Sequence, residues 1–208
     1  MILDGHIHMR SGDLENRENF MEKLKKAGVD GAVIISPSPG EGDAEDRLKQ
    51  VMKFTEGNSN LFPFFRMDPM ADDALDQIER ADNAGIKGFK FICTHYRPDE
   101  ERPLEIFEAI TERDFPILFH SGISYGGINS SNNHRPANFE ALFNIDGIRF
   151  ALAHIGWPWV DEMLAVYGKF VNRIRDKSSI EMYIDITPGT PPIYREEALS
   201  KAFQIGYD

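Results

Sequence analysis

The feature that most constrains the fold is a series of seven short apolar segments distributed along the whole chain. Each segment is bounded by polar residues, Gly or Pro, as is typical of β-strands. Most segments are apolar on both faces, which is expected of strands covered on both sides and therefore indicates a parallel sheet. The segments span residues 2–8, 31–36, 61–67, 88–93, 116–121, 148–154 and 182–187.

Amphipathic helical patterns lie between these segments, over residues 13–28, 72–85, 102–114, 158–177 and 195–206. Strand and helix alternate with a period of about thirty residues, the size of a βαβ unit. Seven units predict an α/β fold, a (β/α)₈ TIM barrel whose eighth strand is missing from the chain, in a single domain over residues 1–208. The alternative is an open doubly wound sheet.

Composition narrows the range of partners. The net charge of −11, without a basic run, predicts a surface that repels nucleic acid and anionic membranes. The apolar run from residue 2 leaves no room for a leader, and every apolar stretch is shorter than the roughly 18 residues of a membrane span. The single cysteine, Cys93, excludes an internal disulfide and suits the cytoplasm. We therefore expect a cytoplasmic protein with a small-molecule substrate, alone or as a homo-oligomer that covers the seam of the missing strand.

The six histidines all lie at strand ends or in the loops that follow. They are His6 and His8 in the first strand, His95 after the fourth, His120 at the end of the fifth, His134 in the next loop and His154 at the end of the sixth. Reactive groups of barrels and of doubly wound sheets collect at the carboxyl ends of the strands. The histidines therefore predict a site at this end of the sheet.

The pair His6 and His8 is the strongest candidate for metal binding. Side chains on a strand alternate, so both imidazoles are expected on one face. Two such imidazoles suit Zn²⁺, and His120 would supply a third ligand, leaving a position for water. We expect one divalent metal, zinc before manganese. His154 would then orient the water or transfer its proton as the catalytic residue. Alone, a histidine at a strand end is more often a hydrogen-bonded structural residue, but the recurrence of histidines at several strand ends favours metal binding.

Two cationic residues at strand ends are candidates for substrate binding. Arg66 ends the third strand and could hold an anionic group of the substrate, or pair with Asp68. Lys90 lies in the fourth strand and could bind a substrate carboxylate, or pair with a neighbouring acid.

Three further residues are candidates for the walls of the pocket. His95 could line its mouth, and Tyr125 belongs to a loop, residues 122–135, that could act as a lid. Trp157 could wall the pocket, although an aromatic residue before a long helix is more often part of the packing.

Five motifs at strand ends resemble those of the amidohydrolase superfamily. They read "DGHIH", "GIKGFKF", "PILFHSG", "RFALAHIGWPWVDE" and "MYIDIT", and they cover essentially the whole chain in order. The sequence is most similar to the amidohydrolase-related branch. That branch holds metal-dependent hydrolases and relatives of aminocarboxymuconate-semialdehyde decarboxylase.

The resemblance implies roles for individual residues. His6, His8 and His120 match the metal ligands of the family. His154 matches the strand-six histidine, which acts on water or substrate in mononuclear members and binds a second metal in binuclear members. Lys90 matches a lysine that is carboxylated in binuclear members, where it bridges the two metals.

One residue of the family pattern has no counterpart. Members carry an aspartate at the end of the eighth strand, which binds the metal and acts as the base. Asp208 precedes the place of that strand, and Asp185 lies in the seventh strand, where relatives carry a similar acid that is not catalytic. The resemblance thus implies a metal-dependent hydrolase of amides, lactones or esters. The alternatives are a non-oxidative decarboxylase of an unsaturated or aromatic carboxylate and a degenerate, non-catalytic barrel.

Overall fold

A computed structural model describes residues 1–10, 12–125, 127–175 and 179–206. The chain divides into two compact units, Met1–Lys90 and Phe91–Asp208. A single domain over residues 1–208 remains a prediction. Among the described residues, no helix combines the length and the apolar character that crossing a membrane requires.

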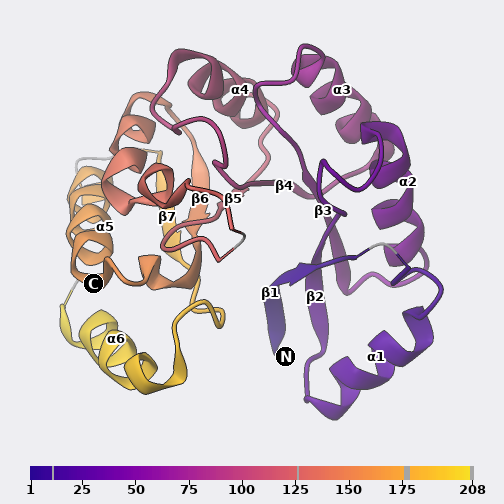
Figure 1. The fold of residues 1–208 in the computed structure, drawn as a ribbon, viewed down its shortest axis with the longest axis horizontal. Coiled ribbons are helices and arrows are strands. Elements are labelled where there is room, and N and C mark those ends of the chain that lie inside the picture. Colours follow the sequence, from indigo (N-terminus) through magenta and orange to yellow (C-terminus); the bar gives the residue numbers. More distant parts are fainter. Residues whose placement is uncertain (11, 126, 176–178, 207–208) are drawn as a thin grey trace. The chain divides into compact units, whose positions relative to one another are not determined.

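The first unit alternates parallel strands with helices. Its elements are β1 (Leu3–His8), α1 (Arg17–Lys26), β2 (Gly31–Ile35), α2 (Ala44–Thr55), β3 (Leu61–Arg66), α3 (Ala74–Ala84) and the start of β4 (Gly88–Phe91). The strands are neighbours in chain order, and each pair is parallel. The three helices lie on one side of these strands (Figure 1). A doubly wound sheet reverses its strand order and carries helices on both faces, so this unit has the organisation of a barrel.

The second unit continues the alternation. Its elements are α4 (Glu101–Thr111), β5 (Ile117–Phe119), two 3₁₀ segments (Ser131–His134 and Pro136–Asn144), β6 (Arg149–Leu152), a third 3₁₀ turn (Ala153–Gly156), α5 (Val160–Arg175), β7 (Glu181–Ile184) and α6 (Pro192–Gln204). Strands β5, β6 and β7 are again parallel neighbours in chain order. The seven expected strands are confirmed, each within a few residues of the predicted bounds.

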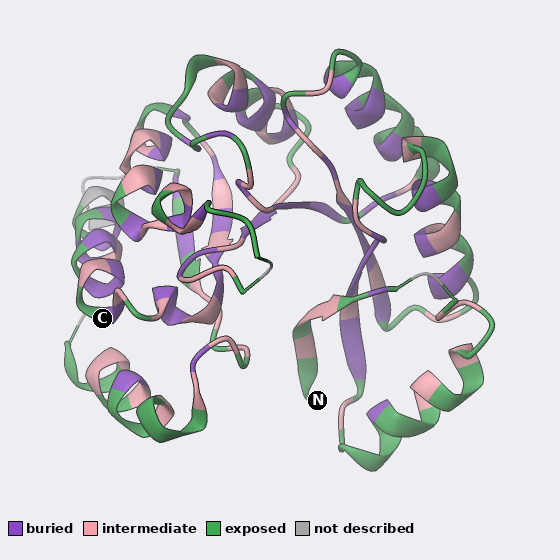
Figure 2. Ribbon diagram, viewed as in Figure 1, coloured by how far each residue is buried: buried purple, intermediate pink, exposed green. Residues whose placement is uncertain are grey.

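Strand β1 contains one extra residue relative to its neighbour β2. Asp4 is opposite Ala32 and Ile7 is opposite Ile34, so three steps along β1 correspond to two steps along β2. The Asp4 carboxylate accepts a hydrogen bond from the His6 backbone N–H at 2.9 Å, across this irregularity. Strand β1 is only partly buried, whereas β2 is mostly buried (Figure 2).

The core of the second unit is centred on Phe119, the last residue of β5. Its fully buried ring contacts four other aromatic rings at centroid distances between 4.8 and 6.1 Å. These rings belong to Phe91, Phe107, Phe139 and Phe150. Such interlocked rings contribute beyond their buried area and hold the end of β5 rigidly.

Helix α2, which the sequence patterns do not single out, carries the buried residue Arg47. The helix starts at the Asp43 cap, whose side chain accepts from the Asp46 N–H at 2.8 Å. The Arg47 guanidinium donates to the backbone oxygens of Pro37 (3.3 Å) and Arg66 (2.6 Å). Burial lowers the pKa of Arg47, and the nearby charge of Arg66 lowers it further. Arg47 thus ties the loop after β2 to the end of β3.

We expect Arg47→Met to lower the free energy of unfolding by about 2–3 kcal/mol, because it leaves buried carbonyl oxygens without their donor. Denaturant titration of the variant and of Lys53→Met, an exposed change on the same helix, measures the difference. The control is expected to stay within about 0.5 kcal/mol of the unmodified chain. Equal stability of the two variants would contradict the role assigned to Arg47.

Candidate active site

His6 and His8 lie together at the end of β1. Their Nε2 atoms are 3.1 Å apart, and their ring centroids are 5.0 Å apart. Two nitrogen ligands of a tetrahedral zinc ion, each about 2.05 Å from the metal, are about 3.3 Å apart. The donor atoms and their separation therefore fit two positions of a divalent metal site. His8 is exposed and His6 is half-buried, so an ion can reach the pair from solvent.

Arg66 and Lys90 lie on the same face of the first unit's sheet as His8. His8 is in register with Ile35, Ile35 with Phe64 and Phe64 with Gly88. Two residues further along β3 and β4, Arg66 and Lys90 are themselves partners in register. Side chains two residues apart on a strand share a face. Arg66 and Lys90 are therefore neighbours on this face, with Lys90 fully buried and Arg66 half-buried.

A cluster of three imidazoles lies in the second unit. His120 follows β5, and its backbone N–H donates to the Phe91 oxygen at 2.9 Å. Its ring lies 4.7 Å from the ring of His134 and 5.0 Å from the ring of His154, between centroids. His134 is fully buried, and the sequence patterns predict no individual role for it. Its position in the loop after a strand, shared with the other histidines, is the only signal in the sequence that points to it.

His154 is held in an uncommon backbone conformation. It lies in the 3₁₀ turn after β6 with φ of 62° and ψ of 25°, in the left-handed region. Its Nδ1 is 3.0 Å from the Thr187 hydroxyl oxygen, in the loop that follows β7. Histidine is among the residues that occupy this region more often than most, particularly at functional sites.

The remaining predicted residues lie at the periphery of the second unit. His95 is exposed, and its ring contacts the ring of Tyr96 at 5.4 Å. Tyr125 is 71% exposed. Trp157 is half-buried and stacks on Tyr194 with a centroid distance of 5.8 Å. The roles in substrate binding that the sequence suggests for these residues remain predictions.

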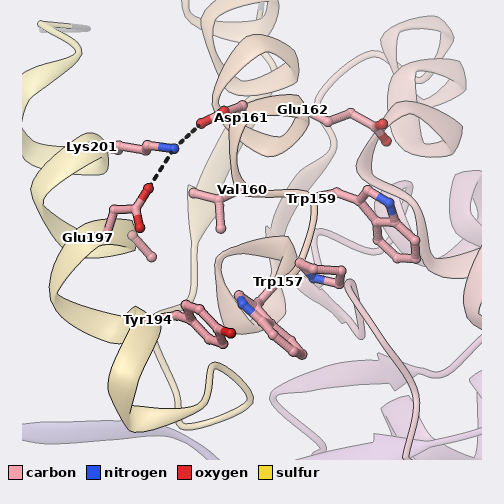
Figure 3. A pocket seen from close by; sticks show the side chains of 10 residues that line it. Trp157, Trp159, Val160, Asp161, Glu162, Tyr194, Glu197 and Lys201 are labelled. Carbon is pink, nitrogen blue, oxygen red and sulfur yellow. Dashed lines mark ion pairs between the residues drawn. The ribbon is translucent and has the colours of Figure 1, made fainter.

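Trp157 also lines a pocket of about 550 Å³ between the start of α5 and helix α6 (Figure 3). Lys201 bridges this pocket by ion pairs to Asp161 (3.0 Å) and Glu197 (3.2 Å). Hydrogen bonds to these two carboxylates raise the pKa of Lys201. The residues that line the pocket include none of the six histidines, so it is distinct from both histidine clusters.

Glu162, at one edge of the same pocket, binds the segment that follows His134. It pairs with Arg135 and accepts from the Ala137 N–H at 3.0 Å. Burial alone raises the pKa of Glu162, but its hydrogen bonds to Arg135 and Ala137 outweigh this effect and lower it. The Arg135 guanidinium also lies over the Trp159 ring, 5.1 Å from its centroid. These contacts fix the chain beside His134 to the first turn of α5.

Across the part of the chain that the structure describes, no group of three or more His, Cys, Asp or Glu side chains is arranged to hold a metal ion. The geometry therefore supports two ligands, His6 and His8. The assignment of His120 as a third ligand and of His154 as the catalytic residue remains a prediction.

Solved structures with the same fold define the class of protein. An amidohydrolase from Burkholderia multivorans, with bound HEPES, has a TM-score of 0.67 at 9% identity, covering 98% of this chain and 79% of its own. A probable 2-pyrone-4,6-dicarboxylic acid hydrolase from Acinetobacter baumannii, with citric acid bound, has a TM-score of 0.54 at 12% identity, covering 100% and 92%. Dihydrodipicolinate synthase from Agrobacterium tumefaciens has a TM-score of 0.52 at 15% identity, covering 97% and 77%. The chain is thus an α/β protein of the (β/α)₈ barrel type, with seven strands among its described residues, and the predicted fold class is confirmed.

The amidohydrolase family model matches residues 18–207. The chain therefore belongs to the amidohydrolase family. The matched region begins after His6 and His8 and includes both His120 and His154. A comparison with curated proteins finds no significant match.

Proposed function

We propose that this chain is a metal-dependent hydrolase that directs an activated water at the carbonyl carbon of a small-molecule amide, lactone or ester. The observation that carries the proposal is the 3.1 Å separation of the His6 and His8 Nε2 atoms, which fits two ligands of one metal ion. Membership of the amidohydrolase family, which is generally metal-dependent, supports it.

In this proposal His6, His8 and His120 hold one divalent metal, zinc before manganese. When bound, the metal supplies a Lewis acid that lowers the pKa of water toward neutrality. His154 accepts a proton as the water attacks and returns it to the leaving group. The contacts of His154 with the Thr187 hydroxyl and the His120 ring hold its imidazole in one orientation for this transfer.

Arg66 and Lys90 bind a carboxylate of the substrate in this proposal. Their positions in register on β3 and β4, on the same face as His8, support this role. Two adjacent cations can bind an anion with charge-assisted hydrogen bonds. A pyrone is a cyclic ester, and the barrel described as a 2-pyrone-4,6-dicarboxylic acid hydrolase is named for a pyrone with two carboxylates. We therefore place carboxylated lactones first among the substrate classes.

The test combines metal analysis of the purified chain with a panel of substrates. The panel holds lactones, amides and esters in matched forms with and without a carboxylate, including 2-pyrone-4,6-dicarboxylate. We expect about one equivalent of metal and hydrolysis that favours the carboxylated lactones. His154→Asn is the inactive control. Release of CO₂ from an unsaturated or aromatic carboxylate would instead indicate a decarboxylase. Full metal content without turnover would indicate a degenerate barrel.

A further inference from the structure

The loop after β7 encloses the ring of His154 on one side. The Thr187 hydroxyl oxygen is 3.0 Å from His154 Nδ1, and the Thr187 carbonyl oxygen is 3.4 Å from the same atom. The Thr190 hydroxyl donates to the His154 backbone oxygen at 3.1 Å. One loop therefore contacts both the ring and the main chain of this histidine.

The loop is itself fixed to the turn that carries His154. The Asp185 carboxylate accepts from the Thr187 N–H at 2.6 Å. The Ile155 N–H donates to the backbone carbonyl oxygen of Asp185 at 3.0 Å. The Asp185 N–H in turn donates to the backbone carbonyl oxygen of Leu152 at 2.9 Å. Thr187 therefore has a defined position relative to the imidazole.

Gly189 is the point of closest approach between the loop and the ring. A Cβ atom at this position would lie 2.3 Å from His154 Cγ and 2.7 Å from His154 Nδ1. These distances are far below van der Waals contact, so the imidazole lies directly against the Gly189 backbone. Any side chain at position 189 would move the ring or the loop, because both sides of the contact are packed.

The carbonyl oxygen beside Nδ1 favours one form of the neutral imidazole, and the hydroxyl can stabilise the same form. A backbone carbonyl only accepts hydrogen bonds, and a hydroxyl can either donate or accept. The Thr187 carbonyl and hydroxyl oxygens can therefore both accept from Nδ1 only when Nδ1 carries the proton. In that tautomer Nε2 is the unprotonated nitrogen of the ring. A hydrogen bond at one ring nitrogen commonly determines whether the other nitrogen carries a proton.

We propose that Thr187 is a positioning residue that holds His154 as the Nδ1–H tautomer, so that Nε2 is the atom that accepts the proton. Gly189 allows the close approach that this contact needs. The catalytic consequence rests on the proposed hydrolase function, whereas the tautomer itself depends on the contacts of the loop alone.

The primary test is ¹H–¹⁵N long-range correlation NMR of the ¹⁵N-labelled full chain, at alkaline pH where imidazoles are neutral. The spectrum of His154→Asn identifies the His154 signals by their loss. We expect the Nδ1–H pattern for His154 in the unmodified chain. Thr187→Val keeps the shape and the carbonyl at 3.4 Å but removes the hydroxyl, which is the nearer acceptor at 3.0 Å. It should therefore lower the Nδ1–H fraction at least about twofold, and Thr187→Ser should restore it.

Thr111→Val is the matched control, because its hydroxyl donates to the Phe107 oxygen at 2.8 Å within α4. It should leave the His154 pattern unchanged. An Nε2–H pattern in the unmodified chain would overturn the proposal, as would a pattern that Thr187→Val does not alter. Gly189→Ala should broaden or shift the His154 signals through displacement of the ring, and an unchanged spectrum would count against the close contact.

The second readout is kinetic, with whichever substrate the panel identifies. Thr187→Val should lower kcat by about 10–100-fold with little change in KM, and Thr187→Ser should recover most of the loss. An unchanged kcat would overturn the positioning role. The NMR result needs neither metal nor substrate. An Nδ1–H pattern in a chain without hydrolase activity would thus refute the proposed function alone, and active hydrolysis with an Nε2–H pattern would refute only this inference.

Discussion

Replacement of both His6 and His8 by alanine is expected to abolish binding of a divalent metal to this chain and to lower hydrolysis more than about 100-fold. The two Nε2 atoms are 3.1 Å apart, a separation that fits two ligands of one metal ion. Removal of both imidazoles leaves His120 as the one proposed ligand, and a single imidazole does not hold a divalent metal ion tightly. Metal content is measured by elemental analysis after dialysis, and affinity by titration with Zn²⁺.

Lys25→Ala, an exposed change on α1, is the control for this experiment and should keep full metal content and activity. The single variants His6→Ala and His8→Ala should each weaken zinc affinity, since each removes one of two adjacent donors. Circular dichroism confirms that the double variant is folded. A folded double variant that retains a full equivalent of tightly bound metal would show that the site lies elsewhere.

Phe119→Ala is expected to have the largest effect on stability, lowering the free energy of unfolding by about 3–5 kcal/mol. The Phe119 side chain is fully buried and contacts the rings of Phe91, Phe107, Phe139 and Phe150. Truncation removes its buried area and leaves a cavity that four rings, each held by other contacts, can fill only in part. Because His120 directly follows Phe119, the change should also displace the His120 ring from its contacts with His134 and His154.

Phe203→Ala provides a matched control, since the same side chain is deleted at a position that is 81% exposed on α6. It should alter stability by less than about 0.5 kcal/mol. Chemical denaturation monitored by circular dichroism measures both variants against the unmodified chain. A loss below about 1 kcal/mol for Phe119→Ala would mean that the aromatic cluster does not form the core of the second unit.

The positions of the strands could be predicted because buried parallel strands are continuous apolar runs. Their ends could not, since hydrogen bonding stops before the apolar run does. The segment 116–121 gives a strand over Ile117–Phe119 only, and the segment 148–154 ends in a 3₁₀ turn. Two of the predicted site histidines, His120 and His154, consequently lie just beyond their strands rather than in them.

Helix α2 and the placement of His134 show where sequence patterns fail. Arg47 occupies the buried face of α2, where a pattern of apolar residues would be expected, and its burial depends on distant carbonyl oxygens. His134 reaches His120 through a loop whose course depends on Gly122, with φ of 89°, donating to the His134 oxygen at 3.0 Å. Both placements result from tertiary contacts, which local periodicity does not encode.

The extra residue in β1 determines which side chains share the face of His8. In an unbroken strand, Asp4, His6 and His8 would point the same way, and a carboxylate would accompany the two imidazoles. The irregularity between Asp4 and Ile7 reverses the alternation of side chains between the two faces. Asp4 therefore lies on the same face as Ile34, whereas His8 lies on the opposite face, with Ile35. The Asp4 carboxylate caps the His6 backbone N–H instead. A one-residue insertion thus takes the Asp4 carboxylate off the face of His8 and leaves His8 on the same face as Arg66 and Lys90.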